Sequence, residues 1–205
     1  MTRCPLTYER IAENKRYSEA GLKRLSPKLK SLDPLAFSAE QLLLEAIKAA
    51  NKMSIQGIQP KLSAVLSIKN HRFAIVDHAG RYILKPPHPV YPEVPENEDI
   101  TMRLASYAGI ETPLHGLIYG IDDKLTYFIK RFDRVNQATK VDVEDFSQLS
   151  AHSRRTKYQS SMEQVAHVID QYTTFPILEK TKLLQRTLFN FNVYQNGNHY
   201  LNNLF

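Results

Sequence analysis

The spacing of the apolar residues changes once along this chain, and that change limits the folds it can adopt. Near residue 54 a helical spacing gives way to alternation, and three short alternating runs follow at 62–68, 72–76 and 81–85. Alternation is typical of strands with one buried face, and turn-forming residues separate the three runs. The pattern predicts an antiparallel meander that follows a helix over about 38–51.

The segment before the meander divides into two parts. Residues 1–37 mix charges with three prolines, which indicates a loop-rich leader with short helical pieces. Ser38 and Gln41 form an S-x-x-Q capping box at the start of the predicted helix. The residues expected on its apolar face are Leu42, Leu43, Ala46, Ile47 and Ala50.

Five prolines between Pro86 and Pro95 predict a rigid extended connector without helix or central strand. Acidic residues over 96–99 then begin a helix that we expect to bury Ile100, Leu104 and Tyr107 or Ala108 and to end at Gly109. The remaining predicted strands are 114–119 and 125–131, and the remaining predicted helices are 143–149, 162–171 and 176–191.

Composition narrows the class of protein. The chain has 205 residues with 42% hydrophobic content, which is enough for a sizeable core, and a single cysteine, which excludes an internal disulfide framework. We expect a cytoplasmic protein, because no apolar run approaches the roughly 20 residues that cross a bilayer. The net charge of +6 is compatible with nucleic acid, nucleotide phosphates or an acidic partner, and does not choose among them.

The order of the predicted elements is that of the two lobes of protein kinases. The expected fold class is α+β and protein-kinase-like, with a strand-rich antiparallel N-terminal lobe followed by an incomplete helical C-terminal lobe. The expected domains are a leader and helix at 1–53, a strand-rich nucleotide-binding lobe at 54–132, and the start of a truncated helical lobe at 133–205.

Three features could carry phosphate chemistry in such a fold. Ser54–Lys61 precedes the first strand, Lys85 ends the third, and Glu98 lies on the following helix. Kinases use a loop over the phosphates, a lysine on the phosphates and a glutamate that holds the lysine. Taken singly, the three are better explained as a turn, a solvent-edge lysine and a helix-dipole partner. Their combination favours the kinase interpretation.

Several longer motifs resemble the HipA-like kinases, and among them most closely the HipT toxins of three-component HipBST systems. The matching segments are 17–25, 54–61, 83–87, 96–98 and 129–134. The resemblance implies a serine/threonine kinase toxin that uses ATP and Mg²⁺ in the bacterial cytoplasm. It also implies a DNA-binding HipB-like antitoxin and a small HipS-like protein as partners, and an aminoacyl-tRNA synthetase as the substrate.

The resemblance also implies roles for individual residues. Ser54 corresponds to an autophosphorylated serine, Lys85 to the lysine on the α- and β-phosphates, and Glu98 to its partner. The residues implied over the phosphates are Gly57, Ile58, Gln59 and Lys61, and those implied at the hinge beside adenine are Lys130, Arg131 and Phe132.

The end of the sequence departs from the family pattern. The catalytic loop of the family resembles N-x-D-x-H-x-K-N-F, whereas this chain has Asn198 at the position of the aspartate and Asn203 at the magnesium-binding asparagine. A register one residue shorter puts Gly197 at the base position instead. Neither register supplies a carboxylate, and an amide is no general base near neutral pH. We therefore expect a truncated, inactive relative; the alternatives are a catalytically dead antitoxin- or nucleotide-binding module and a gene remnant.

Overall fold

The structure is a computed structural model that describes residues 2–50, 60–91, 93–135, 139–151 and 160–194. The chain forms two compact units. Unit 1 comprises Met1–Arg103 and Thr112–Lys140, and unit 2 comprises Leu104–Glu111 and Val141–Phe205. The mixed α+β architecture confirms the predicted fold class.

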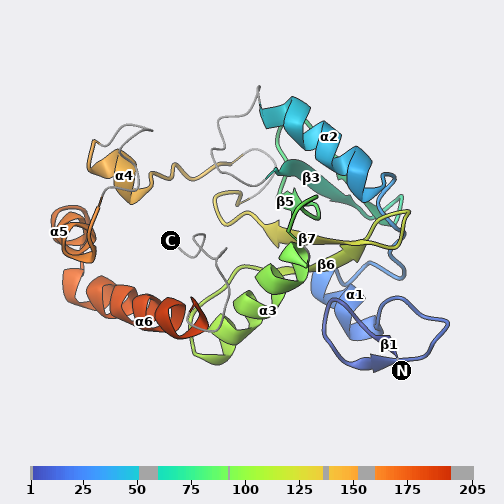
Figure 1. Cartoon of the computed structure of the whole chain (residues 1–205), viewed down its shortest axis with the longest axis horizontal. Coiled ribbons are helices and arrows are strands. Elements are labelled where there is room, and N and C mark those ends of the chain that lie inside the picture. Colours follow the sequence, from blue (N-terminus) through green and yellow to red (C-terminus); the bar gives the residue numbers. More distant parts are fainter. Residues whose placement is uncertain (1, 51–59, 92, 136–138, 152–159, 195–205) are drawn as a thin grey trace. The chain divides into compact units, whose positions relative to one another are not determined.

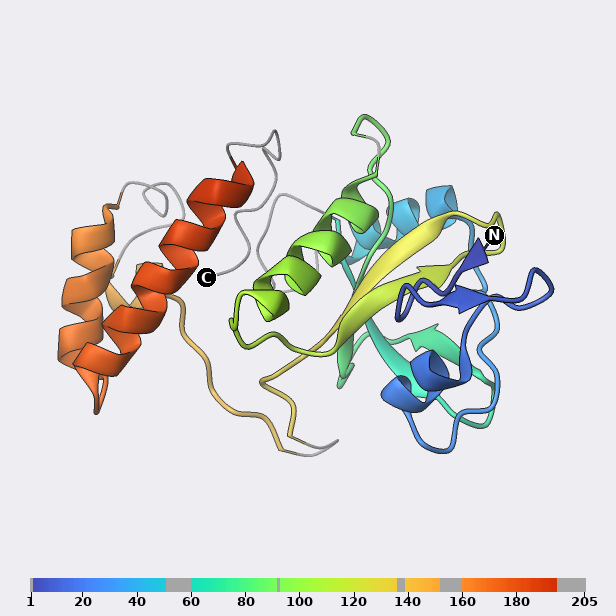
Figure 2. The same ribbon diagram turned by 90° about the horizontal axis from the view of Figure 1, so that it is seen from below.

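Unit 1 is built on a five-stranded antiparallel sheet with the order β4-β3-β5-β7-β6 (Figure 1). Its strands are β3 (Leu62–Ser67), β4 (Arg72–Ile75), β5 (Tyr82–Lys85), β6 (His115–Tyr119) and β7 (Leu125–Lys130). All five lie within a residue or two of the predicted runs. Helix α3 (Val94–Tyr107) joins β5 to β6 and runs alongside the sheet (Figure 2).

The leader is more ordered than the sequence indicates. It contains β1 (Thr2–Arg3), β2 (Arg10–Ile11) and α1 (Glu19–Leu25), and the predicted helix α2 (Ala39–Ala50) follows it. The predicted capping box of α2 is confirmed, because the Gln41 amide N–H donates to Ser38 Oγ at 3.2 Å and the Ser38 N–H donates to Gln41 Oε1 at 2.9 Å.

The leader also completes the core of unit 1. Its side chains pack with strand residues in one apolar cluster, in which Cys4, Leu42, Leu84 and Phe128 are fully buried. The remaining buried members of the cluster are Leu6, Tyr17, Leu22, Leu25, Leu29, Leu32, Leu35, Ala46, Leu62, Ala64, Phe73, Tyr82 and Ile118.

The predicted buried face of α3 is wrong. Ile100, Leu104 and Tyr107 are 39%, 45% and 90% exposed. Half of the buried residues of α3 are instead polar: the buried set is Val94, Pro95, Glu98, Asp99, Thr101 and Ala105. Polar side chains can replace an apolar face there because they find hydrogen-bond and charge partners on the sheet and the leader. The helix also begins at Val94, so Pro95 lies in its first turn, where a missing N–H costs little.

Unit 2 contains α4 (Phe146–Leu149), α5 (Met162–Tyr172) and α6 (Pro176–Tyr194). Helices α5 and α6 pack against each other, and Lys180 Nζ lies 2.6 Å from Asp170 Oδ1. Leu183 is buried, whereas an apolar stripe of α6 faces outward and contains Ile177, Leu184, Leu188 and Phe191. No helix in the described part of the chain is both long and apolar enough to cross a membrane.

Candidate nucleotide site in unit 1

The centre of the candidate site is an ion pair between Lys85, the last residue of β5, and Glu98 on α3. Lys85 Nζ lies 2.9 Å from Glu98 Oε2, and the two side chains are only 14% and 8% exposed. A buried pair of this kind is costly to break, because removal of one partner leaves an uncompensated charge. The structure therefore brings together the two residues that the sequence assigned to phosphate binding.

Tyr127 on β7 is the third residue of this site, after Lys85 and Glu98. It pairs with Lys85 across the sheet, and the Lys85 ammonium lies 5.7 Å from its ring centroid, within the range of a cation–π contact. Burial raises the pKa of the Tyr127 phenol well above its ordinary value, and the charges of Glu98 and Asp99 raise it further. The phenol stays neutral beneath the lysine.

The predicted hinge begins at Lys130, the last residue of β7. The Lys130 N–H donates to the Leu114 carbonyl at 2.7 Å, and the Arg131 N–H donates to the Arg81 carbonyl at 2.8 Å. The backbone N–H groups of Lys130 and Arg131 are therefore both bonded within the protein. Phe132, the last residue of the predicted hinge, is 71% exposed. The predicted hinge residue Arg131 has its guanidinium occupied elsewhere.

Asp133 holds that guanidinium. Arg131 Nε and Nη2 donate to the two Asp133 carboxylate oxygens at 2.8 and 2.6 Å, and Arg134 Nε lies 3.8 Å away. The hydrogen bond from Arg131 lowers the pKa of Asp133 from its ordinary value. This fork-to-fork pair fixes the chain as it leaves β7.

Several predicted site residues lie outside the described residues. They are Ser54, Gly57, Ile58, Gln59, Asn198 and Asn203. Lys61 lies just before β3. In the described ranges no group of three histidine, cysteine, aspartate or glutamate side chains is placed to hold a metal ion.

Two features of unit 1 were missed at the sequence level. Tyr127 looks like any apolar strand residue until the register of β5 and β7 is known. Asp99 and His115 interact at 2.8 Å across sixteen residues, and no local pattern signals such a pair.

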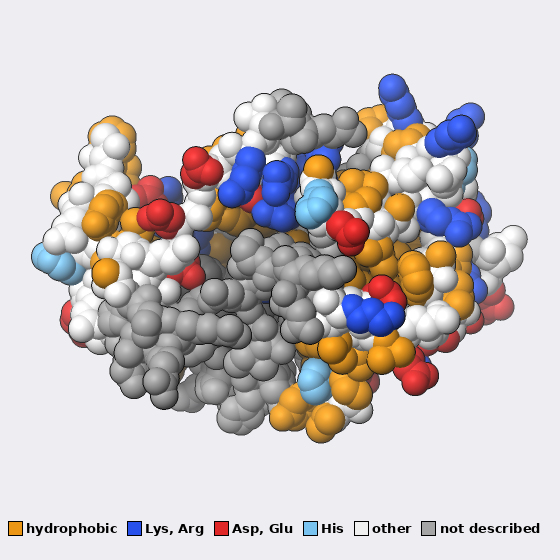
Figure 3. Space-filling view, turned by 90° about the horizontal axis from the view of Figure 1, so that it is seen from above, with side chains coloured by type: hydrophobic (Ala, Val, Ile, Leu, Met, Phe, Trp, Pro, Cys, Tyr) orange, Lys and Arg blue, Asp and Glu red, His pale blue; other side chains and the backbone are white. Residues whose placement is uncertain are grey.

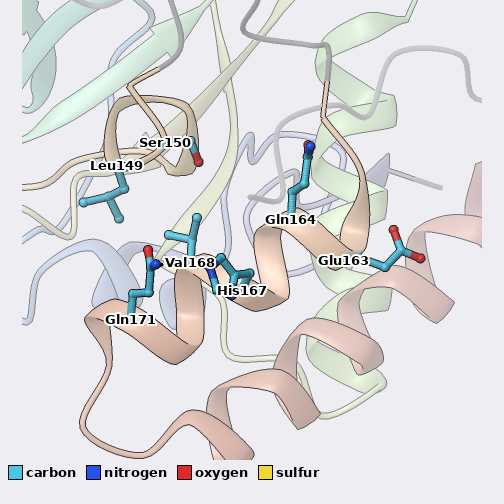
Figure 4. Close-up of a pocket in the computed structure, with 7 residues that line it drawn as sticks. All are labelled: Leu149, Ser150, Glu163, Gln164, His167, Val168 and Gln171. Atoms are coloured by element: carbon cyan, nitrogen blue, oxygen red, sulfur yellow. Dashed lines mark hydrogen bonds between the residues drawn. The ribbon is translucent and has the colours of Figure 1, made fainter.

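Unit 2 contains a hollow of about 420 Å³ between α4 and α5. The residues that line this hollow are Leu149, Ser150, Glu163, Gln164, His167, Val168 and Gln171. Figure 4 shows the Glu163 side chain directed away from Leu149 and Ser150. The polar residues that α5 contributes to this lining are all exposed, so the hollow lacks the buried, preorganised groups of a catalytic site. Lysine and arginine side chains occur in separate groups in the space-filling view rather than in one basic patch (Figure 3).

A strand-rich unit with a buried lysine–glutamate pair between its third sheet-forming segment and the following helix has the architecture of the nucleotide lobe of a protein kinase. The comparisons with known proteins agree with this class. A family model described as the HipA-like C-terminal domain matches residues 53–203. The chain therefore belongs to the HipA-like family.

Individual relatives support the same conclusion. A protein of Haemophilus influenzae named "Putative kinase" is 30% identical over 199 residues, which are 91% of this chain and 57% of the relative. A protein of Sinorhizobium fredii named "Putative kinase Y4dM" is 32% identical over 124 residues, which are 54% of this chain and 30% of the relative. The chain thus spans little more than half the length of the Haemophilus relative.

A solved structure shares the fold. It is HipA of Shewanella oneidensis MR-1, determined in a toxin–antitoxin complex with HipB and its operator DNA. The TM-score is 0.51 with 19% sequence identity, and the match covers 88% of this chain and 51% of that one. The likeness supports the predicted kinase-like fold.

Proposed function

We propose that unit 1 binds ATP as the nucleotide-binding lobe of a HipA-like kinase. The observation that carries the proposal is the buried pair of Lys85 and Glu98, with 2.9 Å between the ammonium nitrogen and the carboxylate oxygen. The lysine offers a positive charge to phosphate oxygens, and the glutamate and the Tyr127 ring hold that charge in one place.

Other residues would complete the nucleotide site. Gly57, Ile58, Gln59 and Lys61 would cover the phosphates, and Ser54 would stand at the position of the serine that is autophosphorylated in catalytically complete relatives. At the hinge the Phe132 N–H would be the donor to adenine, because the N–H groups of Lys130 and Arg131 already have carbonyl partners. Mg²⁺ would neutralise the phosphate oxygens of bound ATP.

We infer that this sequence binds nucleotide without transferring phosphate. Asn198 stands where the family has its aspartate, and residues 196–205 contain no carboxylate that could accept the proton of a substrate hydroxyl. Asn203 remains at the position of a magnesium ligand. The loss of the aspartate favours a second candidate function, in which the chain is a catalytically dead module that binds nucleotide or an antitoxin. The remaining alternative, a gene remnant, would bind neither.

The proposed setting is a bacterial cytoplasmic toxin–antitoxin system of the HipT type. The support is that the solved HipA with the same fold forms a complex with HipB and operator DNA. A HipB-like antitoxin and a small HipS-like protein would be the partners of this chain. An aminoacyl-tRNA synthetase would be the substrate of a catalytically complete relative.

Calorimetric titration of the purified 205-residue chain with ATP and Mg²⁺ tests the proposal. We expect saturable binding that Lys85→Ala removes and that Lys48→Ala, a change in an exposed pair with Glu45, leaves intact. Radiolabelled ATP should transfer no phosphate to the chain or to a synthetase. Equal affinities of Lys85→Ala and the unchanged protein would refute the assigned phosphate contact.

A further inference from the structure

Helix α3 carries two consecutive buried carboxylates that serve different partners. Glu98 pairs with Lys85, as described above. The next residue, Asp99, is 0% exposed and takes no part in the proposed phosphate site. Its Oδ1 lies 2.8 Å from His115 Nδ1 on β6, and its Oδ2 accepts from Arg103 Nε at 2.7 Å.

Arg103 extends this pair to the N-terminal segment. Its Nη2 donates to the Leu6 carbonyl at 3.0 Å and lies 3.4 Å from the Pro5 carbonyl. Its guanidinium carbon lies 3.9 Å from the ring centroid of Tyr8, which is close enough for a cation–π contact. Burial raises the pKa of the Tyr8 phenol, and the charge and hydrogen bond of Asp99 add to that rise. The segment Pro5–Tyr8 therefore contacts the Asp99–Arg103 ion pair of α3.

The same segment is fixed on its other side. Leu6 is 1% exposed within the core of unit 1, and its carbonyl also accepts from Arg24 Nη1 at 2.7 Å. The Tyr8 N–H donates to the Cys4 carbonyl at 2.7 Å, and Tyr8 adopts a left-handed φ of 60°. Such a conformation is unfavourable for a tyrosine and persists only where its surroundings require it.

We propose that residues 5–8 clamp α3 and that Asp99, Arg103 and Tyr8 are positioning residues for Glu98. Successive residues of a helix point about 100° apart, so the direction of Glu98 is set once α3 is held at two points: Asp99 contacts His115 of β6, and Arg103 contacts the Leu6 carbonyl and the Tyr8 ring. Rotation or translation of α3 would break these contacts with β6 and with residues 5–8, whereas the Asp99–Arg103 pair lies within the helix and moves with it. This inference rests on the proposed function, because the affinity for ATP depends on where Glu98 holds Lys85.

The test compares Asp99→Asn with Asp123→Asn in the full chain. Both changes remove one carboxylate charge, but Asp123 forms an exposed pair with Arg16 at 2.6 Å. We expect Asp99→Asn to weaken ATP binding by about three- to tenfold and Asp123→Asn to leave it unchanged. Tyr8→Asn, which tolerates the left-handed backbone but lacks the ring, should weaken binding in the same direction, and Tyr8→Phe less so.

A double-mutant cycle separates positioning from general destabilisation. If Asp99 acts through Glu98, then Glu98→Gln combined with Asp99→Asn should bind ATP no more weakly than Glu98→Gln alone. Additive losses of affinity would overturn the proposal. So would an unchanged affinity of both Asp99→Asn and Tyr8→Asn.

A readout without nucleotide distinguishes failure of this inference from failure of the proposed function. Amine-specific labelling followed by mass spectrometry measures the access of reagent to Lys85, with Lys48 as an exposed reference. We expect faster labelling of Lys85 in Asp99→Asn and Tyr8→Asn, at unchanged labelling of Lys48. A chain that binds no ATP but shows this change would refute only the proposed function; unchanged labelling of Lys85 in folded variants would refute the clamp.

Discussion

Lys85 and Tyr127 are cross-strand partners on β5 and β7, and the lysine ammonium lies 5.7 Å from the tyrosine ring centroid. The ring is almost completely buried, so it presents a fixed electron-rich face to a charge that also pairs with Glu98. A lysine between a carboxylate and an aromatic face loses much of the freedom of its long side chain. This arrangement predicts different effects on ATP binding for removal of the Tyr127 hydroxyl and for removal of the Tyr127 ring.

Tyr127→Phe keeps the ring, and Tyr127→Leu removes it. We expect Tyr127→Phe to bind ATP within about twofold of the unchanged chain and Tyr127→Leu to bind about two- to tenfold more weakly, because a cation–π contact is worth roughly 0.5–2 kcal/mol. Fluorescent ATP-analogue titration measures both. Equal binding by Tyr127→Leu would show that the ring does not matter to Lys85.

The hinge prediction concerns a backbone group. Phe132→Pro removes the N–H that we assign to adenine, whereas Phe132→Ala keeps it and removes only an exposed side chain. We expect Phe132→Pro to weaken ATP binding by about fivefold or more, in line with the loss of one hydrogen bond of roughly 1 kcal/mol, and Phe132→Ala to change it less. The melting temperature of both variants serves as the folding control.

Asp133 gives stability a predicted dependence on pH. The hydrogen bond from Arg131 holds the pKa of Asp133 below its ordinary value of 3.8 in the folded chain. A carboxyl with a depressed pKa stabilises the fold above its unfolded pKa and loses that contribution as the pH falls through the folded value. Urea unfolding should therefore show a loss of stability below about pH 4 that is smaller in Asp133→Asn.

Asp133→Asn should also lower the free energy of unfolding at pH 7 by about 1–3 kcal/mol, because it weakens a nearly buried pair with Arg131. The exposed carboxylate Asp123 provides the comparison, since Asp123→Asn should cost less than about 1 kcal/mol. Similar losses at the two sites would contradict the assignment.

The turn before β5 yields two opposite predictions from neighbouring residues. A Cβ at Gly80 would lie 1.9 Å from Ser63 Oγ and 2.8 Å from the Ala64 backbone nitrogen, so Gly80→Ala should destabilise the chain by about 1–3 kcal/mol. Ala79 has a left-handed φ of 57°, so Ala79→Gly should stabilise it by about 0.5–1 kcal/mol. Thermal unfolding of the two variants measures both effects. Changes of the same sign in the two melting temperatures would contradict the prediction.

The sequence predicted the five strands of the large sheet to within a residue or two, because turn-forming residues separate their apolar runs, but it did not predict the short strands β1 and β2. It also pointed to Lys85 and Glu98, whose positions follow from the order of the elements. The face of α3 could not be predicted, because Asp99 is buried by partners that lie far away in the chain, such as His115. The role of the leader was also missed, since Leu6 contributes a single buried side chain without any periodic pattern.

The buried thiol of Cys4 can be used to measure how often the N-terminal segment opens. The thiol is 0% exposed, sits in the core beneath the N-terminal segment, and accepts from the Ser18 N–H at 3.3 Å. A thiol reagent can therefore reach the single thiol of this protein only when the N-terminal segment detaches or unit 1 unfolds. The rate of labelling by such a reagent, followed with and without ATP or a candidate antitoxin, would measure how often that opening occurs and which ligands suppress it.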